Sequence, residues 1–249
     1  MIIDFHVHGK ITSSFPFNPE DFLLTINEAK ENGLSALAIT EHCHANNFLE
    51  GYNYLESTYN FSNDYYDVNG FKVFYGIEVT TKENLDILII GNPKLVLDLR
   101  EQINSSLDVE KYININKLFS FDIPEELLII LAHPYRNYTV FPDLDYKIVE
   151  RLDAIELNSK DVYKSGLETT RTNVEKLSNT LGLPIVCGSD THHFMQISTA
   201  KNIFTKDCHT VMEIKQEIKQ GNYSHQFSCD LNARVKSAII IKKLIRGKK

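Results

Sequence analysis

The sequence contains no tryptophan and no long apolar run, and these absences limit the classes of protein it can encode. Its longest apolar runs are short, such as the one at residues 127–132. A membrane-spanning helix needs roughly 18 consecutive apolar residues, and the aromatic belt at a membrane interface uses tryptophan and tyrosine. We therefore expect no membrane partner.

Cysteine is scarce and is not arranged for metal binding. The four cysteines are far apart and form no C-x-x-C pair, which argues against a cysteine-based zinc knuckle. The first residues also lack the basic, apolar and small-residue zones of a signal peptide, and polar residues that look functional begin at Asp4. Removal of a leader of about 15–30 residues would delete them. We expect a cytoplasmic protein.

Positive charge is in the minority. The 249 residues carry 26 Lys and Arg against 33 Asp and Glu, a formal net charge of −7. Nonspecific nucleic-acid binding needs a basic surface, so this balance argues against a nucleic-acid partner. The hydrophobic fraction of 43% is ordinary for a globular protein, and the chain is long enough to bury a sizeable core. We expect residues 1–249 to form a single domain.

Short apolar segments alternate with helical patterns along the chain. Helix signals include the cap Asn18-Pro19, the stop Gly182 and a capping box between Thr210 and Glu213. The expected strands lie at residues 1–7, 34–40, 71–79, 85–90, 127–132, 154–157 and 184–187. This alternation predicts an α/β protein with a mostly parallel sheet, either a barrel or a doubly wound fold.

Polar motifs follow the ends of these strands. His6 and His8 lie two residues apart, so their imidazoles share one face of the first strand. Four further strands end in histidine or an acidic residue: T-E-H at 40–42, G-I-E at 76–78, H-P at 133–134 and S-D-T-H at 189–192. Seven of the nine histidines fall in or beside these motifs. Imidazole and carboxylate together suit Zn, Mn or Fe, and a bridging carboxylate holds two ions about 3.5–4 Å apart.

The motifs D-x-H-x-H, T-E-H, G-x-E, H-P and S-D-x-H, in this order between Asp4 and His192, resemble the PHP (polymerase and histidinol phosphatase) family. The resemblance implies a distorted (β/α)7 TIM-like barrel. It also implies two or three divalent transition-metal ions at the carboxyl ends of the strands, and hydrolysis of phosphate esters.

The resemblance also implies a ligand for each ion. The first ion would be held by His6, His8, Glu78 and Asp190. The second would be held by Glu78, as the bridge, and His133. The third would be held by His42 and His192. Where the family usually has another histidine, five residues before Gly91, this sequence has Asp86, which we take as its substitute. Ser14 stands where the family often has a further histidine, so the third ion should be the weakest.

Several other residues are candidates for roles around the ions. Asp190 or His192 could move protons. Arg136, and then Lys10, could bind phosphate oxygens, although either could be a solvated loop charge. Asn158 either lines the pocket or caps a turn. Asp4 either fixes an imidazole tautomer or accepts backbone hydrogen bonds. His44 and His193 are expected to be neighbours of ligands, and His209 and His225 surface residues.

Two segments outside the motifs remain open. Residues 48–75 are rich in aromatic side chains and form either a lid over the site or an insertion that packs its own small core, and we give the second more weight. Residues 239–249 resemble an amphipathic helix that ends in basic charge.

These observations predict a metal-dependent phosphoesterase that acts on a small phosphorylated substrate through a metal-activated water. Histidinol-phosphate phosphatase is the closest named activity that the resemblance implies, with another phosphomonoester almost equally favoured. Two alternatives stay open: a nuclease or proofreading exonuclease of the same family, and a metal-binding module without catalytic activity.

Overall fold

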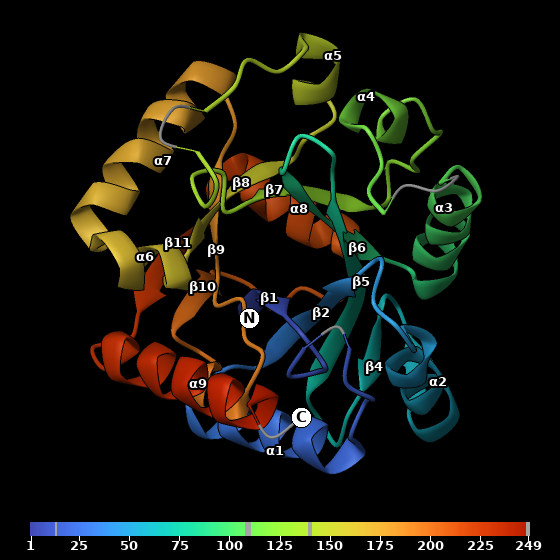
Figure 1. Ribbon diagram of the computed structural model, residues 1–249, viewed down its shortest axis with the longest axis vertical. Coiled ribbons are helices and arrows are strands. Elements are labelled where there is room, and N and C mark those ends of the chain that lie inside the picture. Colours follow the sequence, from blue (N-terminus) through green and yellow to red (C-terminus); the bar gives the residue numbers. More distant parts are fainter. Residues whose placement is uncertain (13, 108–110, 139–140, 248–249) are drawn as a thin grey trace.

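The computed structural model describes residues 1–12, 14–107, 111–138 and 141–247. Strands and helices alternate along this chain, and the helices surround a ring of strands (Figure 1). The strands are β1 (Ile2–Val7), β2 (Ala36–His42), β3 (Asn60–Ser62), β4 (Tyr65–Asp67), β5 (Lys72–Thr80), β6 (Asp86–Gly91), β7 (Leu128–Ala132), β8 (Ala154–Asn158), β9 (Ile185–Gly188), β10 (Ala200–Phe204) and β11 (Tyr223–Phe227). The helices are α1 (Pro19–Glu31), α2 (Leu49–Thr58), α3 (Pro93–Ser105), α4 (Ile115–Leu118), α5 (Tyr146–Val149), α6 (Ser159–Ser165), α7 (Leu167–Leu181), η1 (Phe194–Gln196), α8 (Val211–Gln220) and α9 (Leu231–Arg246).

The ring is a nearly closed barrel whose strand order is β1-β2-β5-β6-β7-β8-β9. Its strands are parallel except for β6, which runs antiparallel to both β5 and β7. The expected distorted (β/α)7 barrel is therefore confirmed. The alternation of strands and helices in the sequence did not predict that one strand is reversed. The reversal has a simple cause: only residues 81–85 join β5 to β6, too few for the crossover that a parallel pair requires.

The barrel closes along a narrow seam between β9 and β1. A parallel bridge pairs Val7 with Thr191, where His8 N donates to Thr191 O at 2.8 Å. Lower in the seam, the buried Asn202 amide donates to Ile3 O at 3.1 Å and to Cys187 O at 2.8 Å. The Asn202 side chain thus links β1 and β9 by hydrogen bonds in place of a backbone ladder.

Two pairings extend this sheet beyond the barrel. β10 pairs antiparallel with β1, and β11 pairs antiparallel with β10. β4 pairs with β5 and carries β3. Helix α8 lies between β10 and β11 in the chain and crosses behind the ring in Figure 1. It closes the end of the barrel away from the polar strand ends.

The helix ends expected from the sequence are confirmed. Asn18 caps α1 by accepting from Glu20 N, with Pro19 as the first helical residue. Thr210 and Glu213 form the capping box of α8. Gly182 ends α7 with φ = 68°, a left-handed conformation that glycine adopts without steric cost.

The barrel interior changes from apolar to polar along each strand. Phe74 on β5, Ala38 on β2 and Ala154 on β8 belong to one buried cluster, together with α8 side chains. Two or four residues further along the same faces come Glu78, His42 and Glu156. A second cluster packs the outer face of the barrel against the helices. The apolar half of the interior therefore supports a polar site at one end.

β1 reaches the same arrangement through an irregularity. Ile3 and Phe5 lie in the interior cluster, whereas Val7 lies in the outer one. The pairing of β1 with β2 shifts register between Asp4 and Val7. A β-bulge re-aims the side chains that follow it, and here it turns His6 and His8 into the barrel interior.

The aromatic segment at residues 48–75 packs into the protein core. Leu55 and Tyr66 are fully buried in the cluster between barrel and helices, and Tyr52, Tyr54 and Tyr59 pack against it. The segment therefore joins the main core and does not pack a small core of its own. Among the described residues, no helix is long and apolar enough to cross a membrane. Lys248 and Lys249, part of the expected basic C-terminal run, lie outside the described residues.

Candidate metal centre

The polar strand ends converge at one end of the barrel. The parallel strands bring their carboxyl ends there, carrying His8, His42, Glu78, His133 and Asp190. Because β6 is antiparallel, its first residue reaches the same end: Asp86 pairs with Thr80 on β5 and with Ala132 on β7, directly before His133. All eight expected metal ligands thus lie at this end of the barrel.

Glu78 lies at the centre of the cluster and is 2% exposed. Its Oε1 is 3.1 Å from His133 Nε2 and 3.4 Å from His6 Nε2. Its Oε2 is 2.6 Å from His42 Nδ1 and 3.5 Å from His8 Nε2. Glu78 therefore lies between imidazoles that are expected to hold different ions, the position that a bridging carboxylate occupies.

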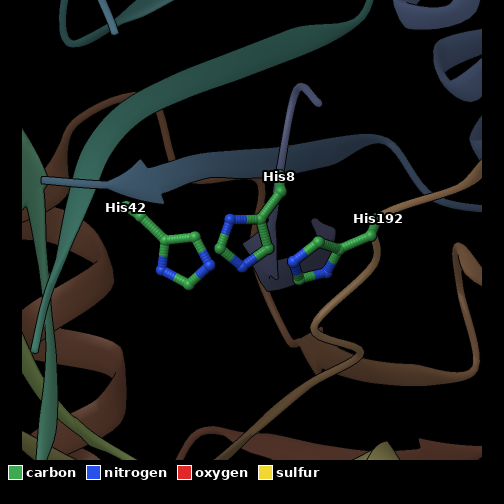
Figure 2. Close-up of side chains that lie close together, drawn as sticks. All are labelled: His8, His42 and His192. Atoms are coloured by element: carbon green, nitrogen blue, oxygen red, sulfur yellow. The ribbon is translucent and has the colours of Figure 1, made fainter. Parts of the chain in front are cut away.

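The ligand atoms fall into overlapping groups in which all atoms lie within 4.8 Å of one another. These groups are His6, His8 and Asp190; Glu78, Asp86 and His133; His8, His42 and His192; and His6, His133 and Glu156. The first three correspond to the three expected ion positions. Figure 2 shows His8 between His42 and His192, with ring centroids 4.5 and 4.0 Å away. His8 therefore faces the third position as well as the first.

Buried atoms without a hydrogen bond indicate what the cluster can hold. Among the described residues, the buried atoms that lack any hydrogen-bond partner include His6 Nε2, His8 Nε2, His42 Nδ1, Glu78 Oε2 and Asp86 Oδ1. Burying a polar atom without a partner costs free energy. These atoms converge, and they are imidazole nitrogens and carboxylate oxygens. The residues present therefore fit divalent transition metals.

The protonation states agree with this fit. Burial raises the pKa of Glu78, but the imidazoles of His42 and His6 outweigh it and hold the pKa well below its usual range. Burial likewise opposes ionisation of Asp190, but Lys160 and Arg136 hold its pKa well below the ordinary value. Metal ligands must be deprotonated, so both carboxylates are in the form that binds ions.

The backbone is strained at two expected ligands. His133 has φ = 27° and Asp190 has φ = 53°, both in the left-handed region that residues with a Cβ rarely adopt. Such conformations cost roughly 1–3 kcal/mol and cluster at functional sites. His133 directly follows the end of β7, and Asp190 lies two residues after the end of β9.

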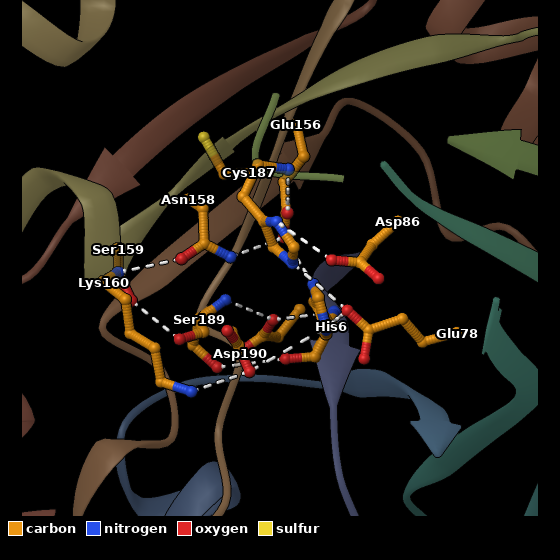
Figure 3. Close-up of polar contacts among 12 residues, drawn as sticks. His6, Glu78, Asp86, Glu156, Asn158, Ser159, Lys160, Cys187, Ser189 and Asp190 are labelled. Atoms are coloured by element: carbon orange, nitrogen blue, oxygen red, sulfur yellow. Dashed lines mark hydrogen bonds and ion pairs between the residues drawn. The ribbon is translucent and has the colours of Figure 1, made fainter. Parts of the chain in front are cut away.

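Carboxylates behind the ligands orient the imidazoles. Glu156 Oε1 lies 2.9 Å from His6 Nδ1 (Figure 3). Its Oε2 accepts from His133 N at 2.9 Å. Glu41 Oε1 lies 3.5 Å from His8 Nδ1, opposite the nitrogen that faces Glu78. Such partners fix the tautomer and orientation of a metal-binding histidine. Asp4 instead accepts from the backbone N–H of His6 and Ser189, the second of its two expected roles.

Sequence reasoning missed Glu156 and Lys160. The signal for Glu156 was its alternation with Asn158 on β8, which places both side chains in the barrel interior. Lys160 follows that strand by two residues, and its Nζ lies 2.8 Å from Asp190 Oδ1 (Figure 3). The same Nζ lies 3.2 Å from His192 Nδ1. Burial lowers the pKa of His192 well below its usual range, and the charges of His8 and Lys160 lower it further.

The two cations expected from the sequence are both bonded to protein oxygens. The Arg136 guanidinium donates to Asp161 Oδ1 at 3.1 Å, to Asn158 Oδ1 at 2.8 Å and to Asp190. Lys10 Nζ donates to Asn46 O at 2.6 Å, in the loop after β2. A phosphate-binding role for either residue stays a prediction. The Ser14 hydroxyl bonds to Thr12 Oγ1 at 3.0 Å.

The remaining histidines divide as expected. His44 packs edge-on against Tyr112, and His193 accepts from Met195 N to cap η1. His209 and His225 are exposed and lie away from the cluster.

No family model matches the sequence, and no curated protein matches it. Solved structures with a similar fold include PsfC from Pseudomonas syringae, with a TM-score of 0.76 and 19% identity over 98% of both chains. The lesion-specific endonuclease Q from Pyrococcus furiosus matches with a TM-score of 0.61 and 20% identity. The match covers 91% of this chain but only 58% of the endonuclease. The chain therefore shares its fold with these proteins.

One expectation is corrected by these comparisons. The acidic composition argued against a nucleic-acid partner, but endonuclease Q has also been solved with a 27-mer duplex that carries an abasic lesion at the active site. That structure matches this chain with a TM-score of 0.59 and 20% identity. Net charge describes the whole surface, whereas binding depends on the charge around the site. Composition therefore does not exclude a nucleic-acid substrate.

Proposed function

We propose that this protein is a metal-dependent hydrolase of phosphate esters. The observation that carries the proposal is the Glu78 carboxylate, whose two oxygens face separate imidazole pairs among buried atoms that lack hydrogen bonds. Two ions shared by such a carboxylate would supply Lewis acidity and an activated water, the means by which two-metal sites cleave phosphate esters.

The expected ligand set is retained in this proposal. His6, His8 and Asp190 would hold one ion, Asp86 and His133 a second, and His42 and His192 a third, with Glu78 shared between the first two. The identity of the metal, among Zn, Mn and Fe, and the occupancy of the third position are left to elemental analysis.

The chain's own residues would act on the substrate around these ions. Burial and neighbouring positive charge hold the pKa of His192 well below its usual range, so its imidazole is in the neutral form that binds an ion. Asp190 is held ionised and bonded by Lys160 and Arg136, which fixes its position. The positive charge of Lys160 at the mouth of the site would offset the negative charge of a phosphoryl group.

Within this class, a phosphomonoester is the first substrate to test, with histidinol phosphate as one member. A nucleic-acid phosphodiester is the second candidate, because endonuclease Q has this fold and was solved with a DNA duplex. This chain spans 58% of that protein's length, so its full activity is not carried over.

The decisive experiment combines metal analysis with one variant. We expect purified protein to contain at least one transition-metal ion per chain, and the loaded protein to hydrolyse p-nitrophenyl phosphate. Glu78→Gln should lower turnover at least about a hundredfold and reduce bound metal, because an amide carries no charge to hold two ions. The matched control is Glu175→Gln, at an exposed carboxylate on α7.

Other results would redirect or end the proposal. Metal bound with no turnover of monoesters, diesters, single-stranded DNA or abasic duplex DNA would indicate a non-catalytic metal-binding module. Near wild-type turnover and metal content in Glu78→Gln would refute the bridging role. DNA cleavage without monoester turnover would favour the nuclease.

A further inference from the structure

A cavity of about 160 Å³ adjoins the metal centre. Two of the expected metal ligands, His8 and His192, form part of its wall. The rest of the wall comes from β1 and the segment that follows it, from β2, and from the helices α1 and η1. A molecule held by ions at His8 and His192 therefore has this cavity directly beside it.

The wall of the cavity is mainly apolar. Its apolar side chains include Ile11, Ile39 and the aromatic rings of Phe15, Phe22 and Phe194. The His193 ring also lines it and packs on Phe194, with the ring centroids 4.3 Å apart. Lys10 contributes its aliphatic stem, because its Nζ donates to Asn46 O at 2.6 Å. The cavity therefore offers aromatic and aliphatic surface to a ligand.

The polar side chains that α1 adds to the wall are used largely within the helix. Asn18 Oδ1 accepts from Glu20 N at 2.9 Å, and Thr25 Oγ1 donates to Asp21 O at 2.9 Å. The Asp21 carboxylate is exposed, and its negative charge repels a phosphate. A phosphate ester would therefore place its phosphate at the metal centre and its alcohol part in the cavity.

The aromatic wall on η1 is fixed relative to the metal centre. The Gln196 side chain is 1% exposed and donates to Asp190 O at 3.0 Å. On its other side, Arg234 of α9 donates to Met195 O at 2.9 Å. These bonds hold η1, and with it Phe194, in place before any ligand arrives. A wall that is already ordered lowers the entropic cost of binding.

We propose that this cavity binds the alcohol part of the substrate, and that this alcohol carries a single planar, apolar ring. The inference rests on the proposed function and names its substrate class. A cavity of about 150 Å³ lined by Leu, Ile and Phe is large enough for one benzene ring. Aromatic walls favour a planar ring through stacked or edge-on contacts. An alcohol such as glycerol would bury hydroxyl groups against apolar side chains, which costs free energy.

The first test measures binding without turnover. Benzylphosphonate and ethylphosphonate have CH₂ in place of the ester oxygen and differ by a ring in place of a methyl group. In metal-loaded protein, benzylphosphonate should bind about tenfold or more tightly, measured by calorimetry. Phe194→Ala should remove most of this preference. The control Phe61→Ala, at an exposed phenylalanine on β3, should keep it.

The second test fills the cavity. Thr25→Phe should raise the KM for phenyl phosphate about tenfold and leave that for glycerol 1-phosphate nearly unchanged, because only the ring needs the space. The matched control is Leu24→Phe, at an exposed position of the same helix, which should change neither value. This test also decides the matter if Phe194→Ala fails to fold.

Equal affinity of the wild-type protein for the two phosphonates would overturn the proposal. An equal rise in KM for both esters in Thr25→Phe would also overturn it. Failure of the proposed function is a separate result: the wild-type protein would then hydrolyse no ester, even where it prefers benzylphosphonate and loses that preference in Phe194→Ala.

Discussion

At the scale of single residues, buried carboxylates of the same type do different work according to what they face. Glu78 faces the Nε2 atoms of His6 and His8, which also face Asp190. Glu156 instead faces the other ring nitrogen of His6, Nδ1, at 2.9 Å. Burial raises the pKa of Glu156, but the His6 and His133 imidazoles outweigh it and lower the value. A close carboxylate behind an imidazole then holds that imidazole in one orientation.

Gly188 shows how closely this inner arrangement is packed. A Cβ at this position would meet Glu156 Oε1 and would lie 2.6 Å from His6 Cβ. We predict that Gly188→Ala lowers the free energy of unfolding by about 3 kcal/mol, because neither neighbour has room to move. Urea denaturation measures the change. Gly247→Ala is the matched control, since a Cβ there lies 3.4 Å from the nearest atom, Lys243 O. Equal stability of the two variants would contradict the crowding at Gly188.

At the scale of elements, helix ends and strand positions could be predicted from the sequence because their signals are local. Asn18, Gly182 and the Thr210–Glu213 box act within a few residues of the chain. Histidines and carboxylates at the ends of apolar strands predicted a metal site, and the resemblance to a known family implied which of them hold each ion, including Asp86 at the start of β6. The β1 bulge was not foreseen: it depends on pairing with β2, which is formed by residues more than thirty positions away.

The same limit explains which site residues the sequence did not reveal. Lys160 contacts Asp190 across 30 positions of sequence. A lone lysine carries no spacing signal, so only the fold brings Lys160 to the centre. Whether residues 1–249 form one domain, and whether the protein is cytoplasmic, stay predictions.

The capping box gives a prediction at this scale. Thr210→Ala should lower the free energy of unfolding by about 1 kcal/mol, because the hydroxyl that accepts from Glu213 N is lost at the start of α8. Thr180→Ala, at an exposed position within α7, should change stability by less than about 0.5 kcal/mol. Urea midpoints of the two variants test the difference. A smaller loss at position 210 than at position 180 would show that the box does not stabilise α8.

At the scale of the whole molecule, the metal centre joins strands from all sides of the barrel. Removing the ions should lower the melting temperature by about 5–10 °C. Ligand at a hundred times its Kd stabilises by about 2.7 kcal/mol, and each kcal/mol is worth about 2–4 °C in a chain of this size. Calorimetry before and after chelation, followed by restoration with Mn or Zn, measures the shift. An unchanged melting temperature after verified metal loss would contradict a stabilising role.

The sequence also predicts the order in which the ions are lost on chelation. The ion at His42 and His192 should leave before the pair that shares Glu78, because it has fewer charged ligands. Anomalous diffraction after mild chelation distinguishes the positions, and full occupancy at His42 with an empty pair at Glu78 would contradict this order.

The seam between β1 and β9 has a consequence for how the protein is made. His6 and His8 leave the ribosome more than 180 residues before Asp190 and His192. Until then β1 has no β9 to meet, and His6 and His8 lack the Asp190 carboxylate that completes their group. Contacts between such distant parts of a chain form late in folding. A nascent or truncated chain that stops before β9 therefore holds only part of the ligand set, and full metal loading reports that synthesis has passed this strand.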